Sequence, residues 1–313
     1  MTKVIMRHYN YQHGSIIFFV LSIISLEEYF GTFILFFNCK TNIMEFLPDR
    51  FKTDKKVVFV TGATGAIGRA IAWNIGRHPD YAVIMLVRNP DKAVKVLDEI
   101  RNRSGNEEVY FYIIDLSCKK DIDKLAETYH GPLHVLVNNA STTPRSKQTN
   151  NEGIELQWAT NVLGYFYMMK AFTPHLKSGT SARIVNVASY WAGGLDLDDP
   201  EFMHRQYNND TAYRQSKQAE RMLSTAFASV LSTHNISVNA CHPGDVNSNL
   251  SNDLGFGGHE SPDRGAATPV WLAVDPATGQ QTGKYFEHQR ESPCQFSTDK
   301  ALVDRLVTVC ESY

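Results

Sequence analysis

From Lys55 onward, short apolar runs alternate with longer helix-forming segments, and this alternation limits the fold more than any other feature. The runs that predict strands are Val57–Val60, Ala82–Val87, Val109–Ile114, Leu133–Val137, Arg183–Val187, Ile236–Cys241 and Lys284–Phe286. The segments that predict helices are Ile67–Arg77, Asp91–Arg101, Asp121–His130, a long helix within Gly153–Lys177, Thr211–Thr233 and Gly265–Val274. Strands this apolar need helices on both faces, so we expect a doubly wound parallel α/β sheet, a Rossmann fold in a single domain.

A glycine-rich segment, Thr61–Gly68, stands between the first expected strand and the first expected helix. Glycines there permit a tight turn and a close approach to a pyrophosphate, and the helix N-terminus offers free N–H groups to the phosphates. The segment could simply pack strand on helix, but its place at this junction favours a dinucleotide site. The expected cofactor contacts in and after it are Thr61, Gly62, Thr64, Gly65, Ala66, Ile67, Gly68 and Arg69.

The residue that follows the second strand indicates which dinucleotide binds. An acidic residue there would hydrogen-bond the ribose 2′-hydroxyl of NAD, but this chain has Arg88, whose cation pairs with the 2′-phosphate of NADP(H). Arg88 could otherwise be a solvated surface arginine. After the third strand, Asp115 and Leu116 are expected at the adenine, although Asp115 could equally cap the next helix.

Tyr213 and Lys217 lie four residues apart in an expected helix, which places both side chains on one face. A phenol has a pKa of about 10, and a neighbouring ammonium favours the phenolate and lowers that pKa. The spacing alone is common on helix faces. Ser189, which follows the fifth strand, could donate to a substrate oxygen as negative charge develops there, or could cap a turn.

Asparagines after the fourth strand, and a Pro-Gly pair after the sixth, complete the pattern. Asn139 and Ala140 end the fourth strand, and Asn161 lies in the helix that follows; the asparagines could instead be structural amides. Pro243, Gly244 and Val246 follow the sixth strand, where the nicotinamide half of a dinucleotide would lie.

Over Lys55 to about Phe286 the chain resembles the short-chain dehydrogenase/reductase family. The matching blocks, in family order, are Thr61–Gly68, Asn138–Ala140, Asn161, Ser189, Tyr213 with Lys217, and Pro243-Gly244. The resemblance implies a catalytic tetrad of Asn161, Ser189, Tyr213 and Lys217 and a reaction that interconverts a carbonyl and an alcohol. It implies that Tyr213 passes the proton, Ser189 holds the substrate oxygen, Lys217 binds the nicotinamide ribose and tunes Tyr213, and Asn161 supports a water relay.

Two residues depart from the family pattern, and one long spacing indicates a particular branch of the family. Ala66 stands where the family has its middle glycine, and Ser141 stands where it has a glycine after Asn-Asn-Ala. The 24-residue step from Ser189 to Tyr213 is long for the family. With Arg88, this insertion resembles the branch of retinol dehydrogenases and WW-domain oxidoreductases, which implies NADP(H) and apolar, retinoid-like or steroid-like substrates.

Composition excludes several other classes of function. A net charge of −2 gives no reason to expect nucleic acid as a partner. The five cysteines are odd in number and far apart, which predicts a reducing, cytoplasmic location and no disulfide scaffold. No motif with metal-ligand spacing occurs, so no metal is expected. Homo-oligomerisation stays open, and so does a non-catalytic NADP(H) sensor of the same fold, although the intact tetrad favours the enzyme.

Residues 1–50 differ from the expected domain of residues 51–313. Two apolar runs, Ile16–Leu26 and Tyr29–Phe37, are each too short to span a bilayer, and two glutamates separate them. Three interpretations stay open: an appendage outside the fold, a membrane anchor at residues 16–37 that would tether the protein to a membrane such as the endoplasmic reticulum, or a signal sequence. A membrane-tethered scaffold is the least favoured function.

Every expected site residue lies after Lys55, so a chain that starts at Met44 should fold and bind NADPH like the full chain. Circular dichroism and NADPH fluorescence titration of both proteins measure this. An insoluble shortened chain beside a soluble full-length one would show that the first residues belong to the core.

Overall fold

The computed structural model describes residues 51–313 and contains an eight-stranded sheet in the order β3-β2-β1-β4-β5-β6-β7-β8. Neighbouring strands are parallel except β7 and β8, which are antiparallel. Their bounds are β1 Lys56–Thr61, β2 Tyr81–Val87, β3 Val109–Ile113, β4 Val135–Asn138, β5 Arg183–Val187, β6 Ser237–His242, β7 Tyr285–Glu287 and β8 Arg290–Ser292. The order reverses between β1 and β4, the point at which doubly wound sheets bind ligands.

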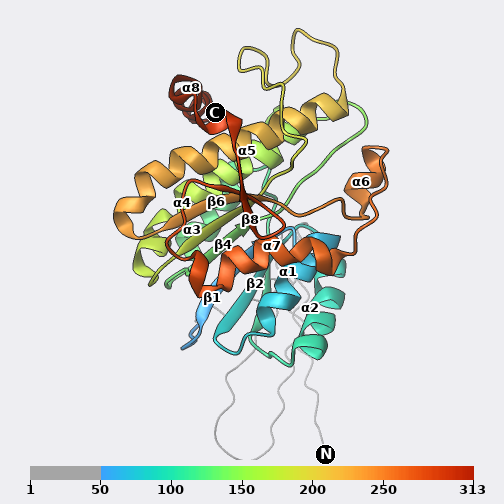
Figure 1. Cartoon of the computed structure of the whole chain (residues 1–313). Coiled ribbons are helices and arrows are strands. Elements are labelled where there is room, and N and C mark those ends of the chain that lie inside the picture. The colour runs from blue at the N-terminus through green and yellow to red at the C-terminus, as the bar shows by residue number, and fades with distance from the viewer. Residues whose placement is uncertain (1–50) are drawn as a thin grey trace, which may run out of the picture. The chain divides into compact units, whose positions relative to one another are not determined.

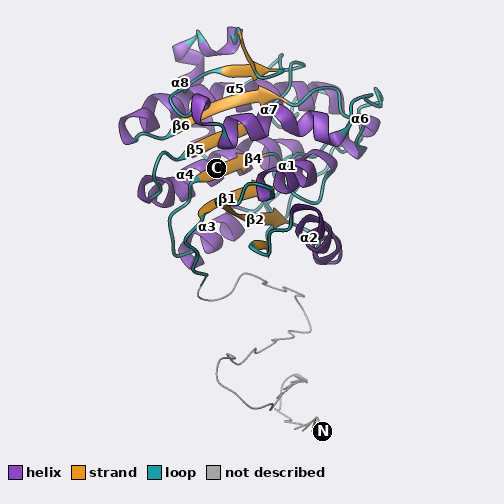
Figure 2. Ribbon diagram, turned by 60° about the horizontal axis from the view of Figure 1, so that its bottom comes forward, coloured by secondary structure: helices purple, strands orange, loops and turns teal. Residues whose placement is uncertain are grey.

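Helices cover both faces of the sheet (Figures 1 and 2). One layer holds α1 (Ala66–Gly76), α2 (Pro90–Ser104) and α7 (Pro262–Val274). The other holds α3 (Lys119–Thr128), α4 (Gly164–Ser178) and α5 (Asn209–Leu231), with α8 (Lys300–Glu311) packed on α5. The short elements are η1 Trp158–Leu163, η2 Ser232–His234, α6 Asn249–Asp253, η3 Pro276–Thr278 and η4 Gln295–Ser297.

Strand β1 shows why its sequence is apolar throughout. Val58 and Val60 pack with the α1–α2–α7 layer, whereas Val57 and Phe59 pack with the layer of α3, α4 and α5. Successive side chains of a strand point to opposite faces, so a strand between two helix layers buries all of them. Each of these four side chains is at most 2% exposed.

The predicted fold is confirmed, and each expected strand and helix is present with small shifts at its ends. Two α-helices and one strand were missed, besides short 3₁₀ turns. Helix α6 lies inside the polar, glycine-rich segment of residues 245–263, where no helix was expected, and α8 follows the last expected strand. Strand β8 has no apolar run, because its exposed residues join the sheet only through antiparallel backbone pairing with β7.

Residues 1–50, including both apolar runs and Met44, lie outside the described residues. Within residues 51–313, no helix is both long enough and apolar enough to cross a membrane.

Candidate active site

The glycine turn between β1 and α1 depends on two glycines for different reasons. Gly62 has φ +66°, a backbone conformation that L side chains rarely adopt. A Cβ on Gly68 would lie 2.4 Å from the Gly62 carbonyl oxygen and 2.6 Å from Asn139 Nδ2, so only glycine fits between them. The turn is therefore shaped by close backbone contact.

Thr61 and Asn139 fasten this turn to the end of β4. Thr61 Oγ1 accepts hydrogen bonds from the backbone N–H of Asn139 at 2.8 Å and of Ala140 at 2.9 Å. Asn139 Nδ2 donates to the Thr61 carbonyl at 2.9 Å. Thr61 is fully buried, and these bonds use its hydroxyl, so Thr61 and Asn139 hold the turn in shape.

The N-terminus of α1 has no side-chain cap. Gly65 is its N-cap residue, and the first turn of the helix holds no acidic residue. Helices α2, α5, α7 and α8 are capped by side chains, whereas α3, like α1, is not. Free N–H groups and the positive end of the helix dipole suit an anion, and Ala66 adds only a methyl group at the start of this helix.

Arg88 follows β2 at the same edge of the sheet, where the neighbouring Leu86 carbonyl accepts from the Gly62 N–H at 2.8 Å. Its side chain is exposed, and no described carboxylate forms an ion pair with it. Arg69, in contrast, pairs with Glu99 at 3.1 Å. Of the two arginines, Arg88 is therefore the available cation.

Asp115 closes a local turn after β3. Its Oδ1 accepts from the Ser117 N–H at 3.0 Å and from Ser117 Oγ at 2.8 Å. Helix α3 begins later, with Cys118 at its N-cap, so Asp115 does not cap that helix. Leu116 is buried beside it.

Ser189 and Tyr213 meet at the carboxyl edge of β5. Both side chains are buried, at 5% and 7% exposure. Burial raises the pKa of Tyr213, and the neighbouring Ser189 hydroxyl opposes that rise. The hydroxyl of Ser189 also accepts from the Trp191 N–H at 3.1 Å, which fixes its direction.

Lys217 lies one turn further along α5, with Nζ 5.5 Å from the Tyr213 ring centroid. Its ammonium donates to the Val187 carbonyl at 3.2 Å and to the carboxylate of Glu220 at 2.7 and 3.0 Å. We had expected this charge to lower the pKa of Tyr213. In this structure the Glu220 carboxylate balances it, and Glu220 itself contributes to the raised pKa of Tyr213.

Asn161 lies in η1, a π-helical turn of the kind that often marks functional sites. Its Oδ1 accepts from the Thr142 N–H at 2.9 Å, and its Nδ2 donates to the Thr142 carbonyl at 3.1 Å and to Ser216 Oγ at 3.2 Å. The amide thus joins the segment after β4 to α5, one residue before Lys217. Its proposed link to a water relay stays a prediction.

The segment after β6 starts at the same carboxyl edge of the sheet. Gly244 has φ +104°, and a Cβ there would lie 2.6 Å from a carboxylate oxygen of Glu260. Val246 is 3% exposed and packs against Gly265, where a Cβ would lie 2.3 Å from its Cγ2. Gly265 belongs to α7, so the chain that follows Pro243 packs against the helix layer that also contains α1.

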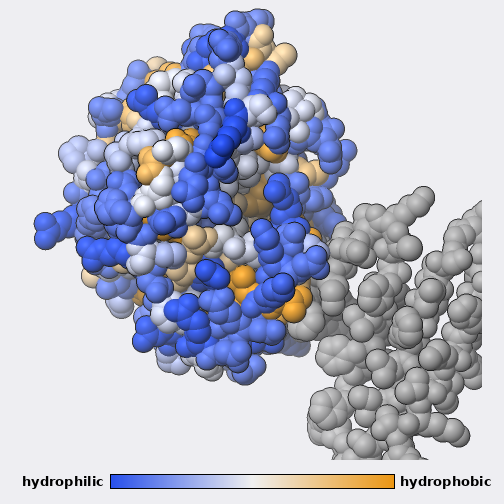
Figure 3. Space-filling model, turned by 90° about the vertical axis from the view of Figure 1, so that its right-hand side faces the viewer, coloured by the Kyte–Doolittle hydropathy of each residue, from blue (hydrophilic) through white to orange (hydrophobic). Residues whose placement is uncertain are grey.

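Sequence reasoning missed a group of aromatic residues beside Ser189. The rings of Trp191 and Phe256 have centroids 4.6 Å apart, as do those of Tyr190 and His242. Tyr190 and Phe256 are 43% and 39% exposed. Figure 3 shows the mostly hydrophilic side on which α6 lies, with apolar side chains gathered in a recess. Phe256, placed between glycines at positions 255 and 257, was the available signal.

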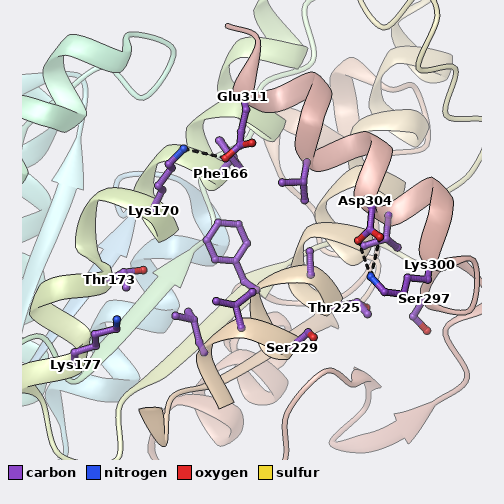
Figure 4. A pocket seen from close by; sticks show the side chains of 16 residues that line it. Phe166, Lys170, Thr173, Lys177, Thr225, Ser229, Ser297, Lys300, Asp304 and Glu311 are labelled. Atoms are coloured by element: carbon purple, nitrogen blue, oxygen red, sulfur yellow. Dashed lines mark hydrogen bonds and ion pairs between the residues drawn. The ribbon is translucent and has the colours of Figure 1, made fainter. Parts of the chain in front are cut away.

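A separate apolar cavity of about 650 Å³ lies between α4, α5 and α8, and Phe166 lines it (Figure 4). None of its lining residues belongs to the expected site. Among the described residues no group of three or more His, Cys, Asp or Glu side chains is arranged to hold a metal ion.

The chain belongs to the short-chain dehydrogenase family of oxidoreductases, whose family model matches residues 56–255. It is 28% identical over 280 residues to retinol dehydrogenase 13 of Homo sapiens, covering 83% of this chain and 84% of that protein. An uncharacterised protein from Mycobacterium paratuberculosis has the same fold, with a TM-score of 0.69, 24% identity, and coverage of 82% of this chain and 92% of that one. An actinorhodin polyketide ketoreductase variant solved with NADPH has a TM-score of 0.60 and 23% sequence identity, and the match covers 76% of this chain and 97% of that one.

Replacing Gly68 by alanine should lower the free energy of unfolding by about 1–3 kcal/mol and weaken NADPH binding, because the new methyl group overlaps the Gly62 carbonyl. Urea denaturation and NADPH titration measure the two effects. Gly76→Ala, at the other end of α1, is the matched control, since its Cβ would meet nothing closer than 3.4 Å. Equal stability of the two variants would contradict the close-contact argument.

Proposed function

We propose that this chain is an NADP(H)-dependent oxidoreductase that interconverts an apolar carbonyl compound and its alcohol, with Tyr213 as the proton-transfer residue. The observation that carries the proposal is that Ser189, Tyr213 and Lys217 are all buried and lie together at the carboxyl edge of the sheet, with Lys217 Nζ 5.5 Å from the Tyr213 ring centroid. Lys217 follows on the same helix, and the open N-terminus of α1 lies at the same edge. The residues that we assign to this site all lie within the described residues 51–313.

The residues present fit the dinucleotide. Gly62, Gly65 and the free N–H groups of α1 would hold its pyrophosphate, and Pro243 and Gly244 would border its nicotinamide. When bound, the cofactor supplies or accepts a hydride at the substrate carbon.

The protein's own residues handle the substrate oxygen and its proton. Ser189 Oγ donates to the substrate oxygen and orients it. Tyr213 gives its hydroxyl proton to that oxygen during reduction and takes it back during oxidation. Lys217 stabilises the phenolate that remains, because its ammonium lies on the same helix face.

Arg88 supports NADP(H) as the cofactor. It is an exposed cation at the end of β2, where a ribose 2′-phosphate would lie, and no described carboxylate neutralises it. The polyketide ketoreductase of the same fold was solved with NADPH.

The aromatic residues near Ser189 support an apolar substrate. Tyr190, Trp191 and Phe256 expose ring surface beside the catalytic hydroxyl groups, and such surface binds apolar groups by excluding water. Glycines at 255, 257 and 258, all with positive φ, would let this loop close over a substrate.

Tyr213→Phe should lower turnover by about 10²–10⁴-fold, because it removes the hydroxyl that moves the proton and keeps the ring. NADPH loss with a panel of aldehydes and ketones measures turnover, and NADPH fluorescence should show unchanged binding. Tyr313→Phe, at the end of the chain, is the control. Near-normal turnover by Tyr213→Phe would rule out the mechanism, whereas NADPH binding by the parent with no turnover on any substrate would favour a sensor.

Lys217→Ala should give a different result, lowering both turnover and NADPH affinity. Lys217 is assigned to the nicotinamide ribose as well as to Tyr213, so its loss affects binding and chemistry together.

Arg88→Asp should reduce the preference for NADPH over NADH by more than tenfold, since a charge-assisted hydrogen bond contributes about 1.5–3 kcal/mol. The ratio of kcat/KM values for the two cofactors measures this. Arg290→Asp, an exposed arginine on β8 at the opposite edge of the sheet, is the matched control. Equal use of both cofactors by the unchanged protein would contradict the assignment.

A further inference from the structure

Glu220 is a fully buried carboxylate with no role in the mechanism above. It lies three residues after Lys217 on α5, and the two side chains are 0% and 3% exposed. The only described side chain that hydrogen-bonds its carboxylate is Lys217, at 2.7 and 3.0 Å. Burying two charges costs several kcal/mol per ion unless the pair is well made, so this pair is a specific arrangement.

The ammonium of Lys217 has no donor left over. An ammonium carries three N–H groups, and here two bond the Glu220 oxygens while the third bonds the Val187 carbonyl. To bind a ribose hydroxyl, as the proposed function requires, Lys217 has to exchange at least one of these bonds. Glu220 therefore competes directly with the cofactor for the ammonium.

The charge of Glu220 also acts on Tyr213. Burial raises the pKa of the phenol, and the Glu220 carboxylate adds to that rise. Burial likewise raises the pKa of Glu220, and the neighbouring Lys217 ammonium opposes this rise. While the pair is intact, the lysine charge is not available to favour the phenolate.

We propose that Glu220 is a positioning residue that holds the Lys217 ammonium against the Val187 carbonyl until the ribose of the cofactor competes for it. Tyr213 then becomes an effective proton-transfer group only in the cofactor complex. This coupling rests on the proposed function, and it would keep the tyrosine protonated in the free protein.

Four other titratable side chains lie near Tyr213, Lys217 and Glu220. They are Tyr165 on α4, Tyr190 after β5, Cys241 on β6 and Asp245 after β6. All of these are present in each variant below, so differences between variants report on Glu220.

The experiment follows the ionisation of Tyr213 through tyrosinate absorbance, as the difference between each protein and its Tyr213→Phe partner. In the unchanged protein Tyr213 should ionise above the ordinary phenol pKa of about 10, and saturating NADPH should lower that value. In Glu220→Gln, ionisation should already occur on the order of one pH unit lower without NADPH. The pH profile of alcohol oxidation should move in the same direction, and NADPH should bind several-fold more tightly.

Glu311→Gln is the matched control, because Glu311 also pairs with a lysine, Lys170 at 3.1 Å, but on the exposed surface. It should change none of these values. If Glu220→Gln does not fold, the unchanged protein still decides: ionisation below about 10 without NADPH, or no response to NADPH, overturns the proposal. Identical ionisation in Glu220→Gln and the parent overturns it as well.

These outcomes separate the two proposals. If Tyr213→Phe abolishes turnover while Glu220→Gln leaves the ionisation of Tyr213 unchanged, only the role of Glu220 is wrong. If Tyr213→Phe remains active, the proposed function is wrong, whatever Glu220 does.

Discussion

Thr61 joins β1 to β4 at the point where the strand order reverses, and the rest of the site depends on this connection. Its hydroxyl accepts from two consecutive N–H groups after β4, while Asn139 returns a bond to the Thr61 carbonyl. The glycine turn begins at the next residue, so its shape is set by contacts on both sides. The backbone at this edge is therefore held by hydrogen bonds between Thr61 and the residues after β4.

Helix α5 combines core packing with a polar interior. Its buried polar side chains are Gln215, Ser216, Lys217, Gln218, Glu220, Arg221 and Ser224. Each needs a partner, because an unpaired buried polar group costs about 1–3 kcal/mol. Arg221 Cζ lies 3.4 Å from the centroid of the Tyr285 ring, and Ser224 Oγ accepts a hydrogen bond from Asn186 Nδ2 on β5 at 2.8 Å. Such a network favours one arrangement of the helix on the sheet, which a purely apolar face would not require.

The sequence predicted the fold well because the hydrophobic pattern of most strands and helices fits their place in the fold. A run such as Val57–Val60 is too apolar for a half-exposed strand, so two helix layers followed directly. Helix α8 was missed, although Val303, Leu306 and Cys310 recur at helical spacing and are buried. Strand β8 had no such signal, since its residues are exposed and polar. They join the sheet only through backbone pairing with β7.

By itself the sequence determined which residues meet at the carboxyl edge, because strand ends and helix starts follow from hydrophobic pattern and glycine placement. It supplied the spacing of Tyr213 and Lys217 and the cation at position 88. Only the tertiary structure decided what those groups face. Glu220 lies three residues from Lys217 in any helix, but its effect depends on complete burial, which removes water and leaves the ammonium as its partner. Likewise, Trp191 and Phe256 are 65 positions apart in number and become neighbours only through folding, because no local pattern specifies a contact between distant loops.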